Sequence, residues 1–238
     1  MLICEDVDKQ FGGIVALDGF DITVDRREIV GLIGPNGAGK TTLFNCVTGI
    51  HKPSGGTIEF DGTSLVGARP HEVCRMGIAR SFQTPRPIRA LTIEENLLAA
   101  RHFGVDGAAD DRRTTDLDET LSLFDLAARR DDDPESLQLM EKKYLDLARA
   151  LMTAPRLLLL DEIMAGLNPG EKDRMVETVG HLQTEYDLAV LVIEHDLAVI
   201  RSLCDRIVVI DEGHNLAEGT ATEIFEDERV QRTYVGGA

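Results

Sequence analysis

The sequence has no tryptophan, few tyrosines and no apolar run long enough to cross a bilayer. Residues 1–6 include no basic region followed by a long apolar stretch, so no signal peptide is expected. The four cysteines, Cys4, Cys46, Cys74 and Cys204, have no C-x-x-C spacing. This argues against a zinc site or a disulfide framework and predicts reduced thiols packed as small apolar residues.

Positive charge is also scarce, since 25 lysines and arginines face 42 acidic residues, for a net charge of -17. Sequence-independent nucleic-acid binding needs a basic face, so we expect no nucleic-acid partner. Direct adsorption to an anionic membrane is disfavoured for the same reason. Acidic residues cluster, as at 131–133, which suggests the hypothesis of a chain adapted to high salt.

What the sequence does contain is a phosphate-binding pattern, G-x-x-x-x-G-K-[ST], between a predicted strand over 28–33 and a predicted helix from 42. Glycines allow backbone N–H groups to approach phosphate oxygens, and the helix N-terminus favours the same anion. Lys40 can reach the β- and γ-phosphates of a nucleotide, and the Thr41 hydroxyl can bind Mg²⁺. The alternative is a glycine-rich turn with an incidental lysine. The residues concerned are Gly34, Pro35, Asn36, Gly37, Ala38, Gly39, Lys40, Thr41 and Thr42.

Two carboxylates, Asp161 and Glu162, directly follow the apolar strand Leu157–Leu160. An acid at the carboxyl end of a buried strand beside a phosphate loop is where Mg²⁺ is held. We expect Asp161 to bind the metal through water and Glu162 to activate the attacking water. The alternative is a pair of solvated acids.

Two further polar side chains end predicted strands. His195 follows the strand 189–193, where it can donate a hydrogen bond to the γ-phosphate, although a lone histidine is usually structural. Gln83 follows the strand 77–82, where its amide oxygen can ligate Mg²⁺ and sense the γ-phosphate.

The order of predicted elements indicates an α/β protein of 238 residues, long enough for one large domain or two small ones. Residues 85–155 read as all-helical, with helices over 92–102, 117–124 and 139–152. The polar segment 104–113 is expected to be mobile. Strands alternate with helices elsewhere, which favours a largely parallel sheet. The other predicted strands cover 2–7, 20–24, 57–60, 206–210 and 214–218, with turn signals at 11–13 and 61–62. Asn168, Pro169 and Glu171 predict a helix that begins at 168, and another helix is expected from about 196.

Taken together, these motifs resemble the nucleotide-binding subunit of an ABC transporter over essentially the whole chain. In that resemblance Gln83 corresponds to the Q-loop, His195 to the switch histidine and 165–168 to the D-loop. Phe11 corresponds to the aromatic residue that stacks on adenine; its alternative is an ordinary buried aromatic. The segments 11–13, 83–87, 91–96, 165–169 and 217–220 further resemble ATPases of branched-chain amino-acid-type importers.

The resemblance implies a P-loop NTPase fold with a mostly parallel core sheet, an N-terminal antiparallel β subdomain and an inserted α-helical subdomain. It assigns 1–84 and 156–238 to the catalytic core and 85–155 to the helical subdomain. It implies ATP and Mg²⁺ as cofactors, transmembrane permease subunits and a second ATPase subunit as partners, and an extracytoplasmic solute-binding protein as an indirect one. The chain would then work peripherally on the cytoplasmic face of the membrane.

One departure from the family pattern is large. The signature L-S-G-G-Q should precede the helix that carries Ala148, and counting back places 137–141 there. Gln138 replaces the serine that contacts the partner subunit's nucleotide, and Met140 replaces a glycine. A hydrogen bond to a charged group contributes about 1.5–3 kcal/mol, so one composite site is expected to be weakened. Smaller departures are Ile163 for a proline and Asn168 for an aspartate.

Three alternatives remain open for the function. The first is a soluble ABC ATPase of DNA repair or translation, although these usually carry paired ATPase domains or long coiled-coil inserts. The second is the ATPase of a lipid or lipopolysaccharide exporter. The third is a nucleotide-gated regulatory subunit with a degenerate signature, which would not hydrolyse ATP.

The acidic composition gives a testable prediction. If the chain is adapted to high salt, its melting temperature rises between low salt and molar KCl, because counterions screen the repulsion among its acidic residues. Thermal unfolding across a KCl series measures this. No stabilisation at molar KCl would remove the hypothesis.

Overall fold

The computed structural model describes residues 1–104 and 115–235. Most of the segment 104–113, expected to be mobile, lies outside the described residues. The four cysteines are free thiols, and Cys4 and Cys46 are buried. Among the described helices, none combines the length and the apolar character that a membrane span requires.

A six-stranded sheet forms the centre of the molecule, in the order β10-β9-β3-β8-β7-β6. All neighbours are parallel except β10, which pairs antiparallel with β9. This agrees with the predicted, largely parallel sheet. Its strands are β3 (Ile29–Ile33), β6 (Ile78–Arg80), β7 (Leu157–Asp161), β8 (Ala189–Ile193), β9 (Arg206–Asp211) and β10 (His214–Gly219).

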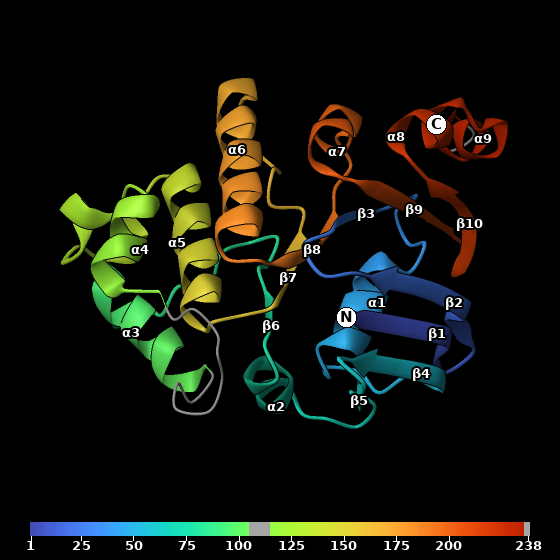
Figure 1. Ribbon diagram of the computed structural model, residues 1–238, viewed down its shortest axis with the longest axis horizontal. Helices are drawn as coiled ribbons and strands as arrows, with labels where there is room; N and C mark the ends of the chain where they lie inside the picture. The colour runs from blue at the N-terminus through green and yellow to red at the C-terminus, as the bar shows by residue number, and fades with distance from the viewer. Residues whose placement is uncertain (105–114, 236–238) are drawn as a thin grey trace.

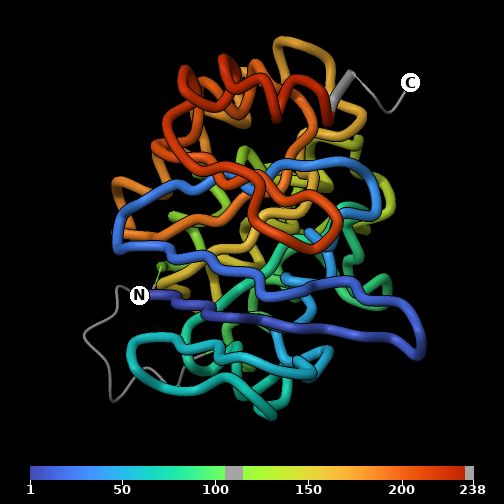
Figure 2. The backbone as a smooth tube through the Cα atoms, turned by 90° about the vertical axis from the view of Figure 1, so that its right-hand side faces the viewer, coloured from blue at the N-terminus to red at the C-terminus, as the bar shows by residue number. Residues whose placement is uncertain are grey.

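A second sheet is antiparallel, in the order β2-β1-β4-β5, and lies beside the first (Figure 2). Its strands are β1 (Leu2–Phe11), β2 (Ile14–Val24), β4 (Gly55–Phe60) and β5 (Thr63–Ser64). The predicted turns at 12–13 and 61–62 both separate strands. The first two strands are longer than predicted, because register shifts let pairing continue where the alternation of apolar residues breaks down.

Helices cover both faces of the central sheet. Helices α3, α4 and α5 gather at one end of the molecule and the antiparallel sheet lies at the other (Figure 1). The helices are α1 (Lys40–Val47), α2 (Pro70–Arg75), α3 (Ile93–Phe103), α4 (Leu117–Leu123), α5 (Leu139–Met152), α6 (Pro169–Glu185), α7 (Leu197–Leu203), α8 (Ala221–Glu226) and α9 (Glu228–Val235). Short 3₁₀ helices span Ala127–Arg129 and Pro134–Ser136. The division into catalytic and helical subdomains at 84 and 155 stays a prediction.

The predicted helix starts at 92 and 168 are confirmed by their caps, and α5 begins at Leu139 as predicted. The Thr92 hydroxyl accepts from the Glu95 N–H, and the Asn168 side chain accepts from the Glu171 N–H. Pro169 occupies the first turn of α6, as expected. Helices α2, α8 and α9 were not predicted, because they are only six to eight residues long and have little apolar periodicity.

The central strands are apolar throughout because both faces of the sheet are buried. Along β7, Leu158 and Leu160 belong to the core cluster shared with α5 and α6. Leu157 and Leu159 belong to the opposite cluster, shared with α1 and the antiparallel sheet. The four leucines read from the sequence as one buried strand therefore join two separate cores.

Shortening one buried side chain of β7 tests how much this strand contributes to stability. Leu159→Ala should lower the free energy of unfolding by about 2–5 kcal/mol, because the side chain is fully buried and leaves a cavity. Chemical unfolding measures the change. The control Leu98→Ala, on α3 and 41% exposed, should stay within about 0.5 kcal/mol. Equal losses in the two variants would contradict the two-core arrangement.

Candidate active site

The phosphate loop connects β3 to α1, which begins at Lys40. Gly37 and Gly39 have φ of 84° and 112°, a region that side chains with a Cβ rarely adopt. A Cβ on Gly39 would lie 2.4 Å from the Ala16 carbonyl oxygen of β2. The glycine at this position is therefore required by the packing of the loop against the antiparallel sheet.

Lys40 is buried beneath this loop, with an exposed fraction of 6%. Its Nζ donates to the carbonyl oxygens of Gly34 (2.6 Å) and Pro35 (2.7 Å). Burial lowers the pKa of Lys40, and the charges of Glu162 and Asp161 oppose this lowering. The phosphate loop and the acidic pair, far apart in the sequence, thus lie within electrostatic reach of each other.

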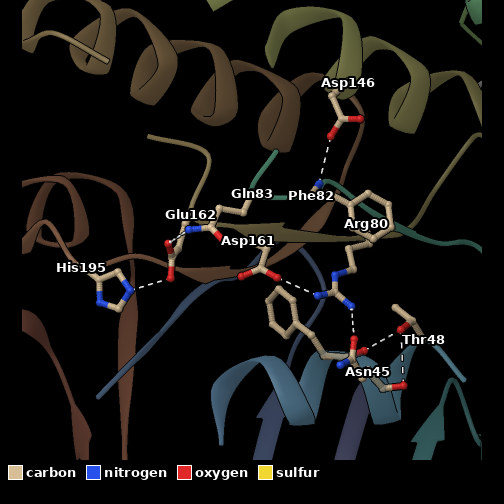
Figure 3. A network of polar contacts seen from close by, with 10 residues as sticks. Asn45, Thr48, Arg80, Phe82, Gln83, Asp146, Asp161, Glu162 and His195 are labelled. Carbon is tan, nitrogen blue, oxygen red and sulfur yellow. Dashed lines mark hydrogen bonds and ion pairs between the residues drawn. The ribbon is translucent and has the colours of Figure 1, made fainter. Parts of the chain in front are cut away.

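Glu162 is the centre of a contact that joins three sequence motifs. The Gln83 Nε2 donates to Glu162 Oε2 at 2.5 Å, and His195 Nε2 lies 2.6 Å from Oε1 (Figure 3). Glu162 leaves the strand with φ of 50°, and its N–H donates to the Ile193 carbonyl of β8. The structure therefore brings together Gln83, Glu162 and His195, the residues predicted to be catalytic.

Asp161, the last residue of β7, points away from this cluster and toward Arg80. Their side chains form an ion pair at 2.7 Å and are 7% and 8% exposed (Figure 3). Arg80 also donates to Asn45 Oδ1 of α1 at 2.7 Å. Sequence reasoning missed Arg80, although an arginine that ends an apolar strand beside Gln83 was a usable signal.

Three more buried charges were also missed. Asp146 of α5 accepts from the Phe82 N–H (3.0 Å), and Glu194 accepts from the Met164 N–H (2.8 Å). The charge of buried Lys143 interacts with both carboxylates. These groups fix the backbone next to Gln83 and the loop after the acidic pair. Asp146 and Lys143 lie on α5 and Glu194 follows β8, so only the fold brings the three charges to these loops.

Phe11 ends β1 and is 42% exposed, which rules out the ordinary buried aromatic considered as its alternative. Its ring lies edge-on to His51, with centroids 5.1 Å apart, and the Lys9 ammonium is 4.7 Å from its centroid. The ring is thus partly engaged by Lys9 and His51, and its exposed part can stack on a planar ligand.

The oxygen donors expected for Mg²⁺ fit that ion. Mg²⁺ uses one or two carboxylates and keeps substrate phosphates and water as its other ligands. Asp161 supplies a carboxylate, and Thr41 and Gln83 supply a hydroxyl and an amide oxygen. No group of three histidines, cysteines or acids that could hold a metal occurs in the described part of the chain. A site with a single carboxylate is compatible with this finding.

Residues 137–141, which depart from the signature pattern, form the N-terminus of α5. Gln138 caps α5, and its N–H donates to the Glu141 carboxylate at 2.7 Å. Glu141 is also paired with Arg129 at 3.0 Å. Leu139 is 44% exposed and would contact a Cβ added at Gly166, so bulky side chains surround the helix start where the family has glycines.

A glycine-rich loop between a buried parallel strand and a helix, within this sheet order, defines the class of P-loop NTPases. A family model described as ABC transporter matches residues 17–165. The high-affinity branched-chain amino acid transport ATP-binding protein BraF of Pseudomonas aeruginosa is 38% identical, covering 96% of this chain and 95% of BraF. The lipopolysaccharide export system ATP-binding protein LptB of Escherichia coli is 34% identical, covering 99% and 97%.

Comparison with solved structures also indicates an ATP-binding cassette. The ADP conformation of MJ1267, an ATP-binding cassette of an ABC transporter, has a TM-score of 0.88 and 30% identity, covering 99% of this chain and 98% of that one. The chain therefore belongs to the ABC transporter family of ATP-binding cassettes, and it is an ATPase.

The packing of the phosphate loop gives a prediction. Gly39→Ala should lower the affinity for an ATP analogue at least tenfold, because the new Cβ clashes with the Ala16 carbonyl and displaces the loop. Equilibrium binding of a fluorescent analogue measures this. The control Gly62→Ala, at φ of 76° in an open turn, should bind normally. Unchanged binding by Gly39→Ala would contradict the assignment of the loop.

Proposed function

We propose that this chain is the ATP-binding and ATP-hydrolysing subunit of an ABC importer that takes up branched-chain amino acids or related small polar solutes. The observation that carries the hydrolytic part is the contact of Glu162 with Gln83 and His195 beside the phosphate loop. The importer part is supported by the 38% identity to BraF over nearly the whole chain.

In this proposal the backbone N–H groups of 34–42 bind the β- and γ-phosphates of ATP, and Phe11 stacks on the adenine. The Lys40 Nζ exchanges its two carbonyl acceptors in the loop for phosphate oxygens, which is favourable because the amine is already buried and oriented. Thr41, Gln83 and Asp161 would hold Mg²⁺. When bound, Mg²⁺ neutralises phosphate charge.

Glu162 is proposed as the general base. Its carboxylate lies at the carboxyl edge of the sheet, and contacts on both oxygens fix its orientation. When ATP binds, these contacts must loosen so that one oxygen accepts a proton from the attacking water. His195, 41% exposed at its side chain, can then donate to the γ-phosphate.

The proposed partners are permease subunits at the cytoplasmic face of the membrane, where the chain is held by protein contacts. A groove of about 320 Å³ lies between α3, α5 and β6, with Ile50, Phe82, Ile88 and Phe103 among its lining residues. Its apolar lining suits an amphipathic segment of a permease. Phe103 lines this groove, whereas Leu97 of the same helix belongs to the core.

A second ATPase subunit is part of the proposal, since ATP would be held between the phosphate loop of one subunit and the signature of the other. The helix start at Gln138 and Leu139 has neither the serine nor the glycines of that signature. We therefore propose a heterodimer in which this chain hydrolyses ATP against its partner's signature. The site that this chain completes for the partner would turn over slowly.

An exporter remains the second candidate because LptB matches 99% of the chain. Reconstitution with each kind of permease separates the two. Uptake of an amino acid into cells or vesicles supports the importer, and extraction of a lipid supports the exporter. The chain alone does not fix the solute, which is selected by the permease and the binding protein.

Substituting the proposed base tests hydrolysis. Glu162→Gln should reduce Mg²⁺-dependent phosphate release by about 10²–10⁴-fold while ATP still binds, because the amide cannot accept the proton of water. Phosphate release from the chain with its partner subunit, alongside ATP binding, measures this. The control Glu177→Gln, on the exposed face of α6, should retain normal rates. Hydrolysis that persists in Glu162→Gln, or is absent from every wild-type assembly, would contradict the proposal.

A further inference from the structure

Arg80 contacts two sides of the molecule at once. It is the last residue of β6, and its guanidinium pairs with Asp161 and donates to Asn45. It also lies over the ring of Phe82, 5.2 Å from the centroid (Figure 3), and over that of Phe44, at 5.4 Å. Aromatic faces attract a cation, so they help to fix the guanidinium in this place.

The same side chain lines the apolar groove, together with Phe82 and Asp146. The Arg80 Nε is buried and has no hydrogen-bond partner among the described residues. A buried donor without a partner is costly, so the present arrangement leaves one polar atom of Arg80 unsatisfied. Arg80 is thus shared between the wall of the groove and the carboxylate expected at the metal.

We infer that Arg80 is a positioning residue whose guanidinium pairs with the Asp161 carboxylate while no divalent cation is bound there. We further infer that a segment bound in the groove weakens or strengthens this ion pair through Arg80. The first part concerns this chain alone. The second part rests on the proposed function, because it requires that a permease segment occupies the groove.

The first part follows from charge. A buried carboxylate needs a compensating cation, and here Arg80 provides it. A divalent cation that approaches Asp161 is attracted by the carboxylate and repelled by the guanidinium, so the two compete for one ligand. Metal binding must therefore weaken the Arg80 contact or work against it.

The second part follows from position. A segment that enters the groove contacts Phe82 and Arg80, which form part of its wall. The backbone N–H of Phe82 is held by Asp146, so Phe82 itself is restrained. The guanidinium is the lining group that also touches Asp161. If a bound segment displaces the Arg80 guanidinium, the competition between Arg80 and a divalent cation for Asp161 changes.

The test uses Arg80→Met in the isolated chain, read by thermal unfolding and not by activity. Without Mg²⁺ and nucleotide, the melting temperature should fall by about 5 °C or more, because Asp161 is left buried and unpaired. In a Mg²⁺ titration at fixed ATP, the midpoint of the Mg²⁺-induced stabilisation should move to at least about threefold lower Mg²⁺. Arg80→Gln, a smaller perturbation, should move it in the same direction if Arg80→Met does not fold.

Arg149→Met is the matched control. Arg149 also lines the groove and also has a buried Nε without a partner among the described residues, but its ion pair is with Asp146. This variant should leave the Mg²⁺ midpoint unchanged, and Arg80→Lys, which retains the charge, should stay near wild type. A midpoint in Arg80→Met that is unchanged, raised or equal to that of Arg149→Met would overturn the inference and leave Arg80 with a purely structural role.

The groove is tested separately with the cognate permease. The permease should shift the Mg²⁺ midpoint of the wild-type chain but not that of Arg80→Met, even though both bind it. Equal shifts in both chains would overturn the link to the groove. If the wild-type chain binds no permease, the proposed function fails instead, and the result for the isolated chain still decides the first part.

Discussion

The arrangement of strands β3, β8 and β7 is the constraint on which the whole site depends. These strands are parallel neighbours, so their carboxyl ends meet at one edge of the sheet. β3 leads into the phosphate loop, β7 ends at the acidic pair, and β8 ends just before His195. The interaction of buried Lys40 with both Asp161 and Glu162 follows directly from this order.

Much of the fold and of the candidate site could be predicted from the sequence, because the patterns that indicate them lie within short segments. A continuous run such as Leu157–Leu160 requires a strand buried on both faces, and the capping residues at 92 and 168 fix where helices begin. The fold class and the meeting of Gln83, Glu162 and His195 were therefore predictable. The roles of these residues in catalysis stay predictions.

The buried charges around the site could not be predicted, because they depend on contacts between segments far apart in the sequence. Arg80 looks like any polar strand end until β6 is paired with β7, which places it against Asp161. Asp146 and Lys143 read as ordinary members of an amphipathic helix, yet α5 carries them under the active-site loops. Short helices such as Pro70–Arg75 have too few residues to show a period.

The central claim is that the phosphate loop and the acidic pair close around one nucleotide. A crystal structure of the chain with Mg²⁺ and a non-hydrolysable ATP analogue tests it most directly. The account predicts β- and γ-phosphate oxygens within hydrogen-bond distance of the Lys40 Nζ, the metal beside Asp161 and the Glu162 carboxylate facing the γ-phosphate. An analogue bound elsewhere, or a γ-phosphate remote from Glu162, would contradict it.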